Sequence, residues 1–149
     1  EKDSEVIERH KYGYMIISMN PATAEFSGTK PLNAAMRRRM AVWINFDFLS
    51  VGETISPHEV EMLRKRTKIN QDTAYQIIQA GAELRRQYKA GDLPYGPSLG
   101  DLINWATLVQ DGNTPMAAAE ETIIGLTSDN VEVQSDVRRI LEAVFTKSQ

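Results

Sequence analysis

The sequence predicts an α/β segment followed by a mostly α-helical bundle, so that helix predominates overall. Two short apolar runs, Tyr14–Met19 and Val42–Phe48, lie in the first third of the chain, and helix patterns fill the rest. The first run is continuous, which is typical of a buried parallel strand, and the second alternates, which is typical of a half-buried edge strand. We expect the domains to span residues 1–50 and 51–149.

Start and stop signals delimit the helices. Ser56 and Glu59 have the spacing of a capping box with Pro57 at the first helical position. Ser98 with Asp101 is a second start signal, and glycines end helices. The expected helices are 32–39, Pro57 to about Arg66, Gln71 to about Tyr88, Ser98 to about Gly112, a helix beginning at Thr114-Pro115, and Asn130 to about Thr146.

Apolar periodicity within these helices predicts one packed core. We expect Gly81 to allow a close approach between helices and Trp105 to lie in the core. In the helix that begins at Pro115, Ile123 and Leu126 are placed on the inward face.

The composition excludes several kinds of site. The chain has 149 residues, 42% of them hydrophobic, and no cysteine, which rules out disulfides and thiolate-bound zinc. His10 and His58 lack companion ligands, so no metal site is expected. The net charge of −3 disfavours nucleic acid as the main partner. No run has the length of a membrane-spanning helix, and we expect a cytoplasmic protein.

Two positions in the first third have the chemistry of a phosphoryl-transfer site. Asn20 follows the first apolar run, where α/β sheets bind ligands, and its amide there is suited to hold a water molecule. An arginine before the second run is suited to stabilise charge on a transferring phosphoryl group. As alternatives, Asn20 is a turn residue before proline, and 37–39 is a solvated charge run or a set of phosphate-backbone contacts.

This stretch resembles the AAA+ ATPases, a class of P-loop NTPases, and within them the MoxR-like group. The family pattern is an apolar strand, Thr-x-Asn-Pro, a Gly-Thr loop, Leu-x-x-Ala-Leu, Asp-Arg-Phe and a second strand. Here the matching segments are 18–21, 28–29, 32–36 and 38–40. Arg38 departs from the pattern because the family usually has Asp there.

The resemblance implies roles for two catalytic residues. Asn20 matches the sensor-1 residue, which positions the attacking water, and Arg39 matches the arginine finger, which acts on a neighbouring subunit of a ring. The resemblance therefore implies self-association, as in a hexamer, and an α/β core followed by a helical lid.

The helical part resembles the family's lid. Leu84-Arg85 and 96–100 fit the spacing of the end of one lid helix and the start of the next. Gly100 falls on the sensor-2 position, where the family has a nucleotide-binding Arg. We expect lid closure to depend less on the nucleotide as a result, or Arg85 or Arg86 to supply the charge instead.

No Gly-x-x-x-x-Gly-Lys-Ser/Thr and no apolar strand ending in Asp-Glu occur in the chain, and both lie upstream of this segment in the family. We therefore expect the C-terminal portion of a longer ATPase, inactive by itself. In the full-length protein the resemblance implies ATP and magnesium as cofactors and chaperone-like remodelling of a client protein, often a metalloenzyme. The alternative is a non-catalytic helical module for protein–protein interaction.

Overall fold

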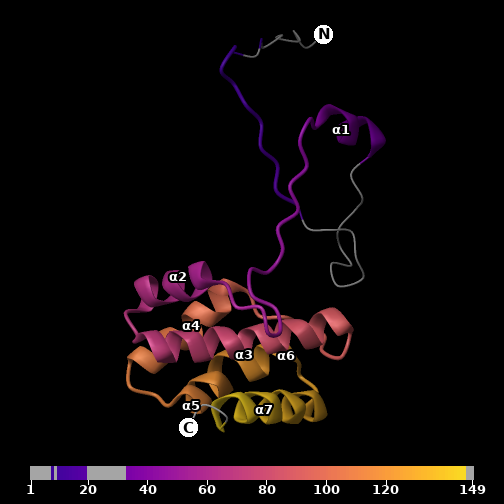
Figure 1. Cartoon of the computed structure of the whole chain (residues 1–149). Coiled ribbons are helices and arrows are strands. Elements are labelled where there is room, and N and C mark those ends of the chain that lie inside the picture. The colour runs from indigo at the N-terminus through magenta and orange to yellow at the C-terminus, as the bar shows by residue number, and fades with distance from the viewer. Residues whose placement is uncertain (1–7, 9, 20–32, 147–149) are drawn as a thin grey trace, which may run out of the picture. The chain divides into compact units, whose positions relative to one another are not determined.

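The fold was obtained as a computed structural model, which describes residues 8, 10–19 and 33–146. The chain divides into two compact units, Glu1–Asn45 and Phe46–Gln149. The first contains the short helix α1, and the second contains the remaining labelled helices (Figure 1).

The second unit, called the helical unit below, is a bundle built around α3. This long helix packs against α2 on one side and α7 on the other, and α4 packs against α2, α3 and α5 (Figure 1). Within the described ranges, no helix combines the length and apolarity that crossing a membrane requires. The elements are α1 Ala34–Arg39, α2 Pro57–Thr67, α3 Gln71–Ala90, α4 Leu99–Gln110, α5 Pro115–Ala119, the π-helical turn η2 Glu120–Ile124, α6 Gly125–Thr127 and α7 Val131–Thr146.

Local capping explains where most of these helices begin. The Asn70 side chain accepts a hydrogen bond from the Thr73 amide at the start of α3. Ser98 and Asp101 form the predicted capping box of α4, and the Thr114 hydroxyl caps α5. Each cap satisfies a backbone N–H that has no partner inside its helix. The predicted helix positions in the helical unit are confirmed to within about two residues.

The core lies where the helices cross. Trp105 is fully buried, its indole N–H donates to the Pro115 carbonyl over 2.8 Å, and its ring meets Phe145 edge-on. Gly81 provides the close approach that was expected, because a Cβ atom added there would lie 2.7 Å from a methyl group of Leu102. The predictions for Trp105 and Gly81 are therefore confirmed.

The predicted capping box at α2 does not form. Ser56 makes no side-chain cap, and the amide of Ser56 donates to the hydroxyl of Ser50 over 3.0 Å. Ser50 thus occupies the place that a Glu59 carboxylate would take in a capping box. Glu59 is 2% exposed and turns into the protein instead.

A π-helical turn changes the predicted face of the helix that begins at Pro115. Its wider turn adds a residue to the helical repeat, so the side chains that follow are rotated about the axis. Ile123 and Ile124 are both buried, and Thr127 is buried after them. Leu126, which periodicity placed inward, is 48% exposed.

Neither predicted strand forms in the described residues. The segments 14–19 and 42–48 have no regular secondary structure, and the one β-bridge of the described chain joins Val51 to Thr54. A strand is defined by hydrogen bonds to a neighbouring strand, and these segments make no such ladder here. The structure is therefore helical, and the α/β part of the expected fold is not observed.

Candidate functional site

The N-terminal unit presents Arg39 at the end of α1. The side chain of Asn33 starts this helix by accepting from the Met36 amide over 2.8 Å. Basic side chains at the C-terminal end of a helix interact favourably with its dipole. Arg37 lies over the ring of Trp43, 5.6 Å from its centroid, and Arg39, like Arg37 and Arg38, is exposed.

This placement leaves Arg39 able to reach a partner molecule. Its role as an arginine finger remains a prediction, since that role concerns a neighbouring subunit. Asn20, the predicted sensor-1 residue, lies outside the described residues, as does the Gly28-Thr29 loop.

Gly100 is the second residue of α4 and is exposed. An added Cβ atom would meet only the Ser98 hydroxyl, at 3.4 Å, which is ordinary van der Waals contact. The positive-φ glycines of the described chain are at other positions. Neither close packing nor backbone conformation therefore requires glycine at this position, and the space there admits a Cβ atom.

The loop before α4 is organised by the Asp101 carboxylate. The carboxylate accepts from the Ser98 amide and hydroxyl, each over 2.7 Å, and from the Tyr95 hydroxyl over 2.8 Å. Burial, and after it the hydrogen bond to Asp101, together raise the pKa of Tyr95 to about 12. These bonds fix the chain immediately before Gly100.

Arg85 does not serve as a free cation near Gly100, which was one of the two expected substitutes for a sensor-2 Arg. It is 1% exposed, and its Nη1 atom lies 2.9 and 3.1 Å from the two carboxylate oxygens of Glu59. Arg86 is exposed and forms a two-point ion pair with Glu83, which raises the pKa of Arg86. Of the two candidates, Arg86 remains accessible.

The buried Arg85–Glu59 pair was missed by sequence reasoning, although a signal for it exists. Glu59 lies four residues before Leu63 and eight before Thr67, so it shares their inward face. Arg85 likewise follows the buried Gly81 by four residues on α3. A charge on each of two apolar faces is the pattern of a buried ion pair.

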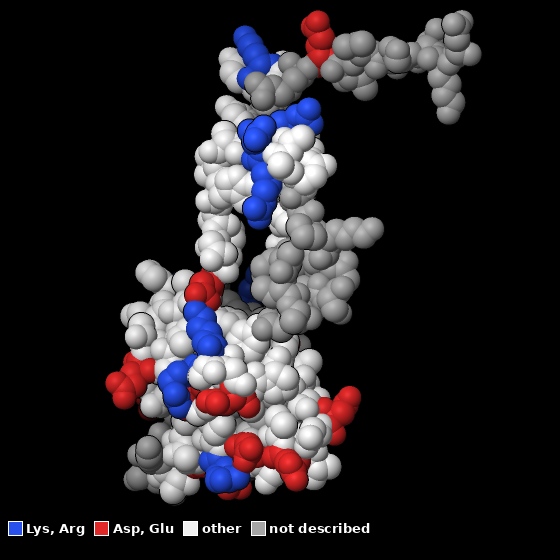
Figure 2. All heavy atoms as spheres, turned by 90° about the vertical axis from the view of Figure 1, so that its right-hand side faces the viewer, with Lys and Arg blue, Asp and Glu red and all other residues white. Residues whose placement is uncertain are grey.

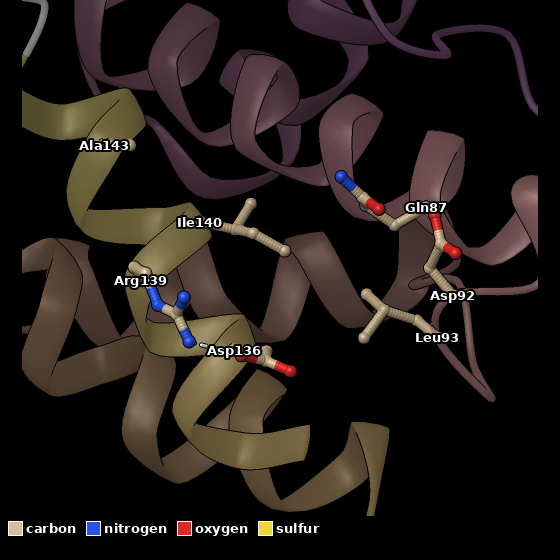
Figure 3. A pocket seen from close by; sticks show the side chains of 7 residues that line it. All are labelled: Gln87, Asp92, Leu93, Asp136, Arg139, Ile140 and Ala143. Carbon is tan, nitrogen blue, oxygen red and sulfur yellow. Dashed lines mark hydrogen bonds and ion pairs between the residues drawn. The ribbon is translucent and has the colours of Figure 1, made fainter. Parts of the chain in front are cut away.

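A pocket of about 320 Å³ lies between α7 and the end of α3 (Figure 3). Leu93 and Ile140 face it from opposite sides, with Asp92, Asp136 and Arg139 at its edges. Asp136 and Arg139 form an ion pair with each other. The lining combines apolar and paired polar groups and brings together none of the predicted site residues.

The exposed charges of the helical unit are interspersed in sign on the face seen in Figure 2. Some form pairs between elements, such as Arg138 on α7, whose Nε and Nη2 donate to Glu120 over 2.6 and 2.8 Å. Mixed charges of this kind are typical of a solvated surface.

Comparison with known proteins identifies a family for the helical unit. Residues 59–144 match the family model described as CbbQ/NirQ/NorQ C-terminal. No curated protein matches the chain. The matched residues run from the first turn of α2 to the last turn of α7 and make up more than half of the chain. The chain therefore belongs to the CbbQ/NirQ/NorQ C-terminal family, which is a C-terminal family of MoxR-like AAA+ ATPases.

Proposed function

We propose that this chain is the C-terminal portion of an ATPase that couples ATP binding and hydrolysis to remodelling or maturation of a client protein. The observation that carries the proposal is the coincidence of the family match, 59–144, with the packed helices α2 to α7. In this proposal the helical unit is the lid over the nucleotide. A metalloenzyme is the client class that the family resemblance favours.

In this proposal the catalytic groups lie in the N-terminal unit. Asn20 positions the attacking water, and Arg39 stabilises the transition state at the nucleotide of a neighbouring subunit in a ring, such as a hexamer. The exposure of Arg39 supports a role in trans, because the side chain of an arginine finger has to be accessible to the neighbouring subunit. ATP and magnesium belong to the full-length protein, and this chain by itself should not bind Mg-ATP with micromolar affinity.

The test uses Arg39→Ala in the full-length protein, with Arg38→Ala on the same helix as the matched control. Loss of an arginine finger lowers turnover by about 10³-fold or more. We expect that loss for Arg39→Ala with nucleotide affinity nearly unchanged, and a much smaller effect for Arg38→Ala. Mixing Arg39→Ala with a subunit that cannot hydrolyse ATP should restore some activity at mixed interfaces. Equal loss of binding and turnover, without rescue, would show that Arg39 is structural.

Gly100 offers a second test in the full-length protein. Gly100→Arg places the family's cation at the start of α4, and Gly125→Arg, at another open glycine, is the control. We expect Gly100→Arg alone to raise ATP affinity or turnover, because the natural chain lacks this contact. If Arg86→Ala cripples hydrolysis instead, Arg86 is the substitute sensor and lid closure keeps its nucleotide dependence.

A further inference from the structure

A buried polar cluster joins three segments of the helical unit that are far apart in the sequence. Arg85 on α3 donates from Nε to the Pro97 carbonyl over 2.7 Å and from Nη1 to the Ser50 carbonyl over 3.2 Å. The same guanidinium pairs with Glu59 on α2, and all of these side chains are in the interior. One side chain thus connects the loop before α2, α2 itself and the loop before α4.

The several N–H donors of arginine, more than its charge, explain why this residue type suits the position. A buried ion pair contributes little net stability compared with apolar side chains of similar size, because both ions lose their hydration. A guanidinium, however, presents several donors in a rigid plane and can serve several acceptors at once. The carbonyls of Ser50 and Pro97 lie in loops, where no helix supplies a donor for them.

The segment 47–56 is attached to α3 along most of its length. Asp47 forms an ion pair with Lys89, and the ring of Phe48 lies 4.7 Å from the Arg85 guanidinium. The amide of Gly52 donates to the carbonyl of Ala82 over 2.8 Å.

The remainder of the segment makes one contact within itself and one with α3. The Ser56 amide donates to the Ser50 hydroxyl, and Gly52, at φ +58°, lies against the Arg86 methylenes. A left-handed residue in such close contact favours glycine. Figure 1 shows this segment reaching the middle of α3 before α2 begins.

We propose that Arg85 is a positioning residue that makes the segment 47–56 part of the rigid helical body. Movement of this body relative to the preceding chain then takes place before Asp47, and not in the loop that leads into α2. The same side chain holds Pro97, so the start of α4, where Gly100 lies, moves with the segment. Only the cause of the movement, the nucleotide cycle, rests on the proposed function.

The test is amide hydrogen exchange in this chain with the double variant Arg85→Met/Glu59→Leu, which leaves no buried charge unpaired. The matched control is Arg138→Met/Glu120→Leu, which removes a two-point pair between helices elsewhere. We expect the amides of Gly52 and Ser56 to exchange at least about tenfold faster in the first variant and unchanged in the control, since local opening follows local contacts. The amides in the middle of α3 should keep their protection in both.

Wild-type exchange rates at Gly52 and Ser56 in the Arg85 double variant would overturn the proposal. Should that variant lose its helices, Arg85→Lys is the deciding test. Lysine keeps a positive charge beside Glu59 but lacks the planar set of N–H donors that serves several acceptors at once. Faster exchange in Arg85→Lys supports the proposal, and unchanged exchange overturns it. None of these measurements involves ATP, so failure of the proposed ATPase activity would not affect them.

In the full-length protein, nucleotide should change exchange before Asp47 and leave Gly52 and Ser56 unchanged. A nucleotide effect at Gly52 and Ser56 would place the movement inside the segment and overturn the proposal. A nucleotide effect absent from the whole chain would count against the proposed function, while the variants above still decide the role of Arg85.

Discussion

The helical unit and the N-terminal unit differ in the burial of their apolar side chains. Ile77 and Ile78 on α3 are completely buried. Ile16 and Ile44, in the two apolar runs predicted to be strands, are 94% and 71% exposed. Apolar residues are thus present in both units, but among the described residues the buried core lies in the helical unit.

The difference follows from how each secondary structure satisfies its backbone. A helix closes its hydrogen bonds within itself, so amphipathic helices need only side-chain packing to make a domain. A strand leaves a row of N–H and C=O groups that another strand must pair. The helical unit therefore buries its apolar side chains by itself, whereas the exposed apolar residues of 14–19 and 42–46 require pairing with further strands before they can be buried.

The largest predicted effect uses the two tryptophans, one in each unit. Trp105 is fully buried and Trp43 is 54% exposed. Trp105→Ala should lower the free energy of unfolding of the helical unit by about 3–5 kcal/mol, since it leaves a large cavity. Trp43→Ala should change it by less than about 0.5 kcal/mol. Thermal unfolding followed by circular dichroism at 222 nm measures both.

Acrylamide quenching of the unmodified chain provides an independent check of the same contrast. Fluorescence of Trp43 should be quenched readily and that of Trp105 should be protected, because quenching requires contact with the ring. Similar destabilisation by the two substitutions, or protection of both rings, would show that the apolar runs are buried in solution and would remove the contrast between the units.

Much of the helical unit could be predicted because its signals are local. Ser98 and Asp101 are three residues apart, and Thr114 with Pro115 marks a helix start directly. The Glu59–Arg85 pair spans 26 residues, and its partners also include loop carbonyls that no sequence pattern identifies. Glu59 also fits the spacing of a capping box, so the sequence predicts a local role for it.

The π-helical turn and the candidate site are two further features that the sequence does not fully predict. Nothing in the period of 3.6 residues indicates where an extra residue enters a helix, so Leu126 was placed on the wrong face. The site residues were assigned by resemblance, and the chemistry proposed for them involves a nucleotide and a neighbouring subunit. The position of Arg39 on a short helix was predictable from the sequence, whereas its role as an arginine finger stays a prediction.

A smaller predicted effect on stability tests how tightly the helical unit is packed. It compares alanine substitutions at two glycines. Gly81→Ala places a methyl group 2.7 Å from buried Leu102, while Gly125→Ala meets no atom within 4 Å. Overpacking costs about 1–3 kcal/mol, and alanine regains up to about 1 kcal/mol in helix propensity. We expect Gly81→Ala to be destabilising on balance and Gly125→Ala to be neutral or stabilising in chemical denaturation. A stabilising Gly81→Ala would show that α3 and α4 pack more loosely than the structure has them.

The smallest effect is a pH dependence and tests whether the order of the helical unit extends to its loops. Tyr95 has its pKa raised to about 12, chiefly by burial and then by its hydrogen bond to Asp101, against about 10 in an unfolded chain. A group whose pKa is higher in the folded state stabilises the fold fully below its unfolded pKa. That contribution is lost as the pH rises from about 10 to about 12, because the unfolded chain releases the proton first. The melting temperature should therefore fall between pH 9 and pH 11 by more in the wild type than in Tyr95→Phe.

At pH 7 the Tyr95→Phe substitution should lower the free energy of unfolding by about 1 kcal/mol, the usual net value of one hydrogen bond. Tyr75→Phe, at an exposed position on α3, is the control and should keep the wild-type pH dependence. Identical alkaline curves for wild type and Tyr95→Phe would mean that the loop before α4 is open in solution and that Asp101 caps the helix without Tyr95.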